Sequence, residues 1–294
     1  MFHIKTDFKR LNMSNEINLR AVDSIGCSVA SIGVVLAIKE KFPEKTLIVY
    51  TKFPELFNSI SGITLTRKEL SGYDVDLRSY YANRLHNNLP YRSIYINMIE
   101  IAENALKTKL RRILPKIVLS QEELDYAKKI LDKNKKPTIW IQKKTNSPNK
   151  NWIEQNWKEL EKKLSLKYAI LELSESNYSL RQSLALTKLC LAGITLDTFL
   201  VHGSNAVGAK NVLVLLGSSR KEVVTYPTQK VVYIKSNCPV QPCGMHGYAI
   251  GCKPVDETLF KGHEKTRCIT DDYRCMTEIS VDKVITSFED MLKN

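Results

Sequence analysis

Residues 17–50 read INLRAVDSIGCSVASIGVVLAIKEKFPEKTLIVY, and this stretch decides the fold. Residues 17–22 form a short apolar run that is typical of a buried strand. A turn containing Gly26 follows, and residues 28–41 place apolar side chains on nearly every face of a helix, which predicts a buried helix. Pro43 ends that helix, and residues 46–50 are suited to a second strand. A strand, a buried helix and a strand in this order predict a βαβ unit of a helix-covered parallel sheet.

The alternation continues along the chain in two runs. The first run adds a short helix, a strand and a longer helical stretch, which we expect at 54–59, 73–77 and 94–114. The strands of the second run are expected at 137–142, 168–173, 194–197 and 211–216, with helices between them and an amphipathic helix at 281–293. Because 294 residues exceed the usual size of one domain, we expect an α/β protein of two doubly wound, Rossmann-like domains. A polar stretch at 131–137 places them at residues 1–133 and 134–294.

The composition is that of a globular protein, with 43% hydrophobic and 26% charged residues. No apolar run approaches the ~20 residues that span a bilayer, and the first twenty residues lack the apolar stretch of a secretory signal, so we expect a cytoplasmic protein. The net charge of +13 is densest at residues 104–116. A solvated helix face is one interpretation, and a peripheral contact with the anionic inner face of the membrane is another. No aromatic stacking motif accompanies the charge, so nucleic acid is not expected as a partner.

Three loops follow predicted strands, at the edge where parallel sheets collect ligands beside helix N-termini. The first loop, at residues 23–28, reads DSIGCS. Gly26 allows a ligand to approach the backbone closely, and Ser28 is positioned to cap the following helix. A purely steric turn is the alternative interpretation.

The second loop, at residues 143–151, offers hydroxyls, amides and cations before a helix. Lys150 is the best candidate in it for neutralising a diphosphate, although a polar surface loop would look similar. Asn151 precedes Glu154 by three residues, which is the spacing of a capping box.

The third loop, at residues 196–209, begins with Asp197 and Thr198 at a strand end. A threonine followed by helix N–H groups predicts a phosphate site, and Asp197 is placed to cap the same helix. His202 belongs to the candidate site, with a buried core histidine as the alternative.

Five of the seven cysteines fall in a loop-rich segment at residues 238–275: Cys238, Cys243, Cys252, Cys268 and Cys275. Thiolates bind zinc or iron tetrahedrally, and four of the five are enough to close such a site. The reducing cytosol disfavours disulfides, and a long segment with little regular structure usually needs a cross-link. We therefore expect a structural zinc or iron ion, with reduced buried thiols or one disulfide as alternatives.

The order of these motifs resembles that of glycosyltransferase family 9, the ADP-heptose:acceptor heptosyltransferases, including its cysteine-bearing members. The matching stretches are Ala21-Val-Asp-Ser-Ile-Gly, Phe42-Pro43, Phe53-Pro-Glu-Leu-Phe57, Asn149-Lys-Asn-Trp152, Asp197-Thr-x-x-x-His202, Leu216-Gly-Ser218 and Cys275-Met276. The similarity runs over most of the chain and is densest at residues 137–280.

The resemblance implies a GT-B-like fold, with two Rossmann-like domains facing a cleft. It implies inverting transfer of a heptose-like sugar from a nucleotide-sugar donor, held by the second domain, to a saccharide, lipid-linked or protein acceptor on the first. The resemblance also implies that no metal is required at the reaction centre. Lys150 and the amides after Thr198 would stabilise charge on the departing diphosphate.

Two features depart from the family. The family carries an aspartate, the catalytic base, directly after the first-loop glycine, where this chain has Cys27. A neutral thiol is a weak substitute, so Asp23 of the same loop is the preferred base. The first half is also short. One alternative is therefore a catalytically weakened relative that binds nucleotide sugars or assists assembly, and another is a metal-binding redox or nucleic-acid module.

Overall fold

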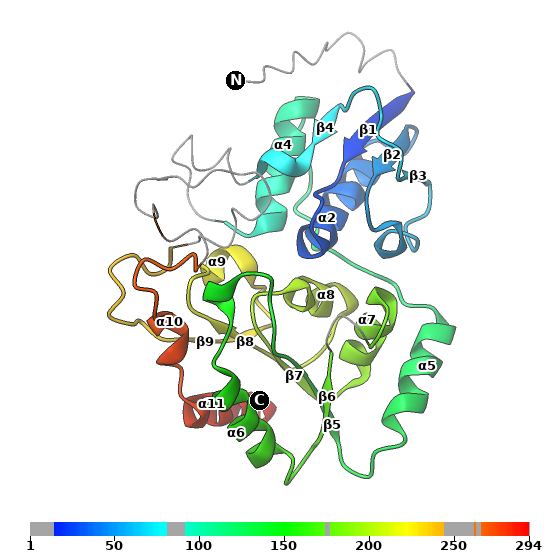
Figure 1. Ribbon diagram of the computed structural model, residues 1–294. Coiled ribbons are helices and arrows are strands. Elements are labelled where there is room, and N and C mark those ends of the chain that lie inside the picture. The colour runs from blue at the N-terminus through cyan, green and yellow to red at the C-terminus, as the bar shows by residue number, and fades with distance from the viewer. Residues whose placement is uncertain (1–14, 81–91, 174–176, 244–261, 263–265, 294) are drawn as a thin grey trace. The chain divides into compact units, whose positions relative to one another are not determined.

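A computed structural model describes residues 15–80, 92–173, 177–243, 262 and 266–293 (Figure 1). The chain forms two compact units, Met1–Val118 and Leu119–Asn294. Each unit carries its own parallel sheet, so the expected α/β class with two doubly wound domains is confirmed.

The sheet of the first unit has the strand order β3-β2-β1-β4, and every pairing in it is parallel. Its strands are β1 (Glu16–Arg20), β2 (Thr46–Tyr50), β3 (Ile63–Thr66) and β4 (Val75–Asp76). Its helices are α2 (Ile25–Lys41), η1 (Pro54–Leu56), η2 (Leu77–Ser79) and α4 (Ile94–Leu106). Helix α2 packs on α4 and buries ten of its residues, as its uniformly apolar sequence predicts.

The sheet of the second unit has the order β6-β5-β7-β8-β9 and is also entirely parallel. Its strands are β5 (Thr138–Gln142), β6 (Ala169–Glu172), β7 (Ala192–Thr195), β8 (Val212–Leu216) and β9 (Lys230–Tyr233). Its helices are α5 (Gln121–Leu131), η3 (Pro148–Lys150), α6 (Glu154–Leu164), α7 (Leu180–Leu189), α8 (Phe199–Val207), α9 (Lys221–Val224), α10 (Arg274–Thr277) and α11 (Val281–Lys293).

Both faces of this second sheet are covered by helices. Alternate residues of β5, β7 and β8 share a core with α6 and α11, in which Trp157 and Phe288 are fully buried. The residues between them point to the other face, where α7 packs between α5 and α8. Gly193 of β7 lies there against Trp140 of β5, and a Cβ at Gly193 would come within 1.9 Å of the indole ring. Glycine at this position is therefore required by packing.

The division between the units falls at Val118 and Leu119, before α5, whereas the sequence placed it at residues 133 and 134. Helix α5 packs on α7, and Glu123 of α5 accepts two hydrogen bonds from the Arg181 guanidinium of α7, of 2.6 and 2.7 Å. The polar stretch at 131–137 is a turn within the second unit, where Asn134 bonds to Thr138. Polarity there marks an exposed turn and not a boundary.

The expected helix at 94–114 is wrong beyond Leu106. Lys107 adopts a left-handed conformation, and the buried carboxylate of Glu103 accepts a hydrogen bond from the Leu110 N–H (2.9 Å) and pairs with Arg112 (2.8 Å). These contacts turn the chain back across the unit, where the Ile113 carbonyl lies so close to α2 that a Cβ at Gly33 would be 2.5 Å from it. Lys109, Arg111 and Arg112 of the basic stretch thus form ion pairs with glutamates of the same unit.

Three expected helix caps are also wrong. The Ser28 hydroxyl donates to the Val22 carbonyl at 2.6 Å inside α2, which begins after Ser24. Asn151 accepts from the Thr145 N–H at 2.8 Å, so α6 starts after Ile153 without a capping box. The cap of α8 is Thr198 and not Asp197. Within the described part of the chain, no helix combines the length and hydrophobicity needed to cross a membrane.

Candidate functional site

The second and third loops meet at the carboxyl edge of the second sheet. Strands β5 and β7 are parallel neighbours, so the segments that follow them leave the sheet side by side. The Lys150 ammonium, at the end of η3, donates to the Asp197 carbonyl at 2.9 Å and lies 3.6 Å from the Asp197 carboxylate. Its side chain keeps 17% exposure. The cation predicted for a diphosphate is therefore held at the start of α8 while remaining accessible.

Asp197 connects this pair to a third strand end. Its carboxylate accepts a 2.5 Å hydrogen bond from the Ser219 hydroxyl, and Ser219 follows β8. The Asp197 carboxylate thus interacts with Ser219 and Lys150, and its neighbour Thr198 caps α8 instead. Lys150, Asp197 and Thr198, which we call the phosphate seat, thus lie together at the N-terminus of α8 and connect the ends of β5, β7 and β8.

Thr198 is fixed by a hydrogen-bond network. Its hydroxyl donates to the Gln142 side-chain carbonyl, lies 3.2 Å from the Thr195 hydroxyl and caps the Leu200 N–H at 3.3 Å. Gln142 is buried at the end of β5. Gln142 was not predicted as a site residue, although a polar residue that closes an otherwise apolar strand at the ligand edge was a usable indication.

His202 lies in the interior, one turn into α8. Its side chain is 4% exposed, and Nδ1 lies 3.0 Å from the Tyr226 hydroxyl. Burial lowers the pKa of the imidazole to about 4, with a smaller rise from Asp197 and a smaller decrease from Lys150. The ring is therefore neutral at pH 7 and packs as a core residue behind the loops.

The first loop, in the first unit, presents a carboxylate and a thiol. Asp23 Oδ2 lies 3.5 Å from the Lys52 ammonium and 3.7 Å from the Arg20 guanidinium, whereas Oδ1 is buried without a hydrogen-bond partner among the described residues. The Cys27 thiol lies 3.2 Å from the Tyr80 hydroxyl. Gly26 is in the first turn of α2, between the two candidates.

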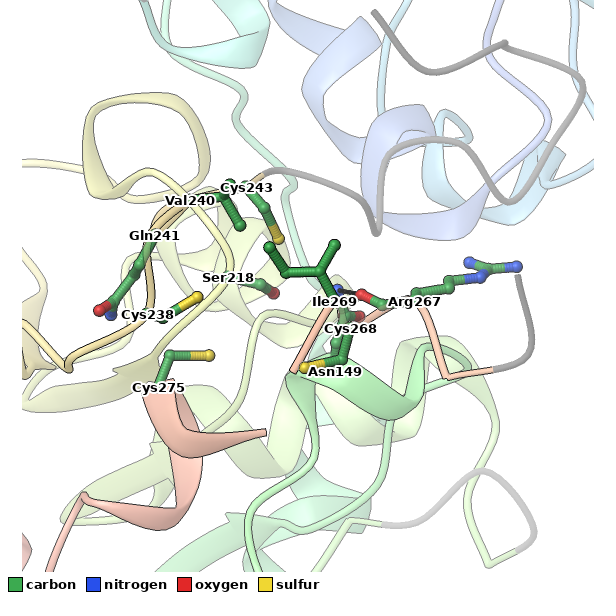
Figure 2. A pocket seen from close by; sticks show the side chains of 10 residues that line it. All are labelled: Asn149, Ser218, Cys238, Val240, Gln241, Cys243, Arg267, Cys268, Ile269 and Cys275. Carbon is green, nitrogen blue, oxygen red and sulfur yellow. Dashed lines mark hydrogen bonds between the residues drawn. The ribbon is translucent and has the colours of Figure 1, made fainter. Parts of the chain in front are cut away.

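Four of the five C-terminal cysteines line one cavity in the second unit, which we call the thiol cavity: Cys238, Cys243, Cys268 and Cys275 (Figure 2). Cys252 lies outside the described residues. None of these four forms a disulfide. Burial raises the pKa of Cys275 to about 12, and the other three thiols act in the same direction. Cys238 and Cys243 come from one stretch of this segment and Cys268 and Cys275 from another, and the fold brings the two pairs together.

Two further polar groups line the thiol cavity. The Ser218 hydroxyl and the Asn149 side-chain carbonyl are buried there with no hydrogen-bond partner among the described residues. Buried polar atoms are hydrogen-bonded in most folded proteins, so these two oxygens are available to a group bound in the cavity. As placed, no three His, Cys, Asp or Glu side chains of the described residues form a ready metal site. The cavity thus brings the four thiols and two oxygens together, but their positions are not those of a formed coordination site.

No family model and no curated protein sequence matches the chain, but several solved structures do. The ADP-heptose lps heptosyltransferase II of E. coli matches with a TM-score of 0.65 at 13% identity, over 95% of this chain and 98% of that one. A family 9 glycosyltransferase of Veillonella parvula matches with a TM-score of 0.66 at 13% identity, over 95% and 99%. The iron-containing dodecameric glycosyltransferase TibC of enterotoxigenic E. coli matches with a TM-score of 0.68 at 13% identity, over 95% of this chain and 76% of that one. At these low sequence identities the matches establish the fold alone, and they confirm the predicted GT-B-like fold.

Proposed function

We propose that this chain is a glycosyltransferase that binds a nucleotide-diphosphate sugar on its second unit. The observation that carries the proposal is the contact of Lys150 with Asp197 at the N-terminus of α8. The fold adds support, since E. coli heptosyltransferase WaaC, which shares it at 10% identity with a TM-score of 0.56, has been solved with ADP. The proposed reaction moves a heptose-like sugar to a saccharide, lipid-linked or protein acceptor with inversion.

The second unit would stabilise the leaving group. As the bond between sugar and diphosphate breaks, negative charge grows on the diphosphate oxygens. The Lys150 ammonium and the N–H groups that open α8 are fixed before the reaction, so they can offset this charge without reorganising. Ser219 and Gln142 contribute indirectly, by holding Asp197 and Thr198 in place.

The first unit would supply the base. The acceptor hydroxyl loses its proton as its oxygen bonds to the anomeric carbon, and we propose the Asp23 carboxylate as the recipient. The Asp23 side chain is 20% exposed, so an acceptor hydroxyl can approach the carboxylate. Cys27 is the alternative, and a chain in which neither group acts would be the weakened, nucleotide-sugar-binding relative. No metal ion is needed for this step.

We also propose a structural zinc or iron ion in the thiol cavity, with Cys252 as a further candidate ligand. Four thiols and two unsatisfied oxygens facing one space suit a thiophilic cation, and TibC, of the same fold, contains iron. Metal binding would also overcome the burial that keeps Cys275 protonated, because a bound cation deprotonates a coordinating thiol. Elemental analysis of anaerobically purified protein should find close to one zinc or iron ion per chain. Protein that lacks both metals, with every thiol titrating readily, would contradict the assignment.

A thermal-shift screen against ADP, UDP, GDP and their sugars tests the proposed function first. A ligand at 100-fold its dissociation constant adds about 2.7 kcal/mol of stability, which such a screen detects readily. Calorimetry then locates the site. Lys150→Ala should weaken nucleotide binding by about 1.5–3 kcal/mol, the strength of a charge-assisted contact.

Lys188→Ala is the matched control for Lys150→Ala. The Lys188 ammonium donates to the Val207 carbonyl at 2.6 Å, at the opposite end of the same helix α8. Its removal deletes a similar lysine-to-carbonyl contact away from the phosphate seat and should leave nucleotide affinity unchanged. Equal losses in the two variants would mean that the lysines act through helix stability and not through the ligand.

A further inference from the structure

The thiol cavity shares a wall with the loop that carries Lys150. Asn149, which directly precedes Lys150, is buried and donates from Nδ2 to the Arg267 carbonyl at 3.0 Å. The Arg267 guanidinium returns a hydrogen bond of 3.0 Å to the Ser147 hydroxyl. Arg267 adjoins Cys268 in the sequence, and Figure 2 shows Asn149 beside these two residues at the cavity. Two hydrogen bonds thus join the cysteine-bearing segment to the loop at residues 143–151, which carries Lys150.

The opposite wall rests on the strand end that positions Asp197. A Cβ at Gly217 would lie 2.7 Å from Met276 Sδ and 2.8 Å from the Cys275 carbonyl, so the two backbones are packed without space between them. Gln241, between Cys238 and Cys243, donates to the Gly217 carbonyl at 3.3 Å. Gly217 leads through Ser218 to Ser219, which holds Asp197. Lys150 and Asp197 of the phosphate seat are therefore both connected to cysteine-bearing segments.

The segment at residues 267–275 has an unfavourable backbone that needs support. Arg267, Asp271 and Tyr273 have φ values of 54°, 54° and 51°, in the left-handed region that residues other than glycine rarely occupy. Such a conformation is strained for a residue with a side chain, and it persists where surrounding contacts impose it. A cross-link at Cys268 and Cys275 would fix this segment at both ends.

We infer that the thiol cavity and the nucleotide site are thermodynamically coupled. A thiophilic cation bound by the cysteines fixes the 267–275 segment. That segment, through Arg267, holds Ser147 and Asn149, so that Lys150 is positioned for the diphosphate. Arg267 is a positioning residue and does not itself contact the nucleotide. The linkage is reciprocal: bound nucleotide raises metal affinity by the same factor. The inference rests on the proposed function for its two ligands and adds their dependence on each other.

The test measures ADP affinity by calorimetry in zinc-loaded full-length protein and in the same protein after chelation. Coupling of this kind usually amounts to 5- to 150-fold, and we expect ADP to bind on the order of ten-fold more weakly after zinc removal. Arg267→Ala should retain its zinc but bind ADP as weakly as the stripped protein, with or without the metal. Arg274→Ala is the matched control, because this arginine of the same segment pairs with Asp272 (2.6 Å) and should keep the wild-type difference.

Ser147→Ala provides a second, milder variant. It removes only the hydroxyl that Arg267 donates to, and it should reproduce the loss of coupling even if Arg267→Ala folds poorly. Equal ADP affinity in zinc-loaded and stripped wild-type protein would overturn the coupling while leaving the proposed function intact. Absence of ADP binding in both forms would instead refute the proposed function for this nucleotide and the coupling with it.

Discussion

Lowering the pH from 7 to 4 should destabilise the second unit through one buried imidazole, that of His202. Burial lowers its pKa to about 4, from an ordinary value of 6.5. Between pH 4 and pH 6.5 the His202 imidazole is protonated in the unfolded chain but neutral in the folded chain. The free energy of unfolding therefore falls as the pH decreases through this window, and the His202 contribution levels off below pH 4 and above pH 6.5.

The size of the effect follows from the two pKa values. The difference between 6.5 and about 4, at about 1.4 kcal/mol for each pH unit, gives roughly 3 kcal/mol. Carboxylates titrate in the same range, so the wild-type curve alone does not isolate His202. His202→Asn does, because an amide can still bond to the Tyr226 hydroxyl but does not titrate.

Tryptophan fluorescence in urea reports on the unfolding of the second unit, which contains His202. All three tryptophans of the chain, Trp140, Trp152 and Trp157, are buried in Leu119–Asn294. We expect the wild type to lose roughly 3 kcal/mol more than His202→Asn between pH 7 and pH 4. Equal losses in the two proteins would show that His202 is hydrated or protonated in the folded state and would refute the argument.

Four further substitutions test the packing and the proposed base. Gly193→Ala should lower the free energy of unfolding, measured by tryptophan fluorescence in urea, by roughly 1–3 kcal/mol, because its methyl would overlap Trp140. An unchanged free energy of unfolding contradicts this. Glu103→Ala should destabilise the first unit by about 1–3 kcal/mol, seen by circular dichroism, since it removes the acceptor of the Leu110 N–H; wild-type stability would show that water replaces the carboxylate. Asp23→Asn should abolish sugar transfer with nucleotide affinity intact, whereas Cys27→Ser should remain active, and full activity in the first variant eliminates Asp23 as the base.

Periodicity predicted most of the fold because long buried elements leave a strong pattern. The strand at 46–50 and the helix at 281–293 were placed with their observed bounds, and α2 was recognised as buried. Strands β3 and β9 were not predicted, since each is a short, partly exposed edge strand with little hydrophobic contrast. The helix at 94–114 was overextended because the Glu103 carboxylate, and not a proline or glycine, ends it.

The candidate site was only partly accessible from the sequence. Loop position at the sheet edge predicted that Lys150 and Asp197 lie together, because neighbouring parallel strands deliver their loops to one place. The partners of Asp197 and Thr198 were not predictable, since Ser219 and Gln142 reach them from other strands through the strand order β5-β7-β8. Capping by Asp197 was mispredicted for the same reason, because Ser219 and Lys150 engage its carboxylate from other strand ends. Ser28 and Asn151 instead bond to groups six residues earlier in their own loops.

Hydrogen exchange with and without saturating ADP tests most directly whether the second unit holds a nucleotide diphosphate. Binding at the predicted seat should slow exchange of the backbone amides in residues 143–151 and in the first turn of α8, Phe199–Val207, because those N–H groups would bond to phosphate oxygens. The amides of α11, Val281–Lys293, far from both loops in the sequence, provide the internal reference. Protection at both loops above this reference is the predicted result. Bound ADP that leaves both loops unprotected would contradict the assignment of the site.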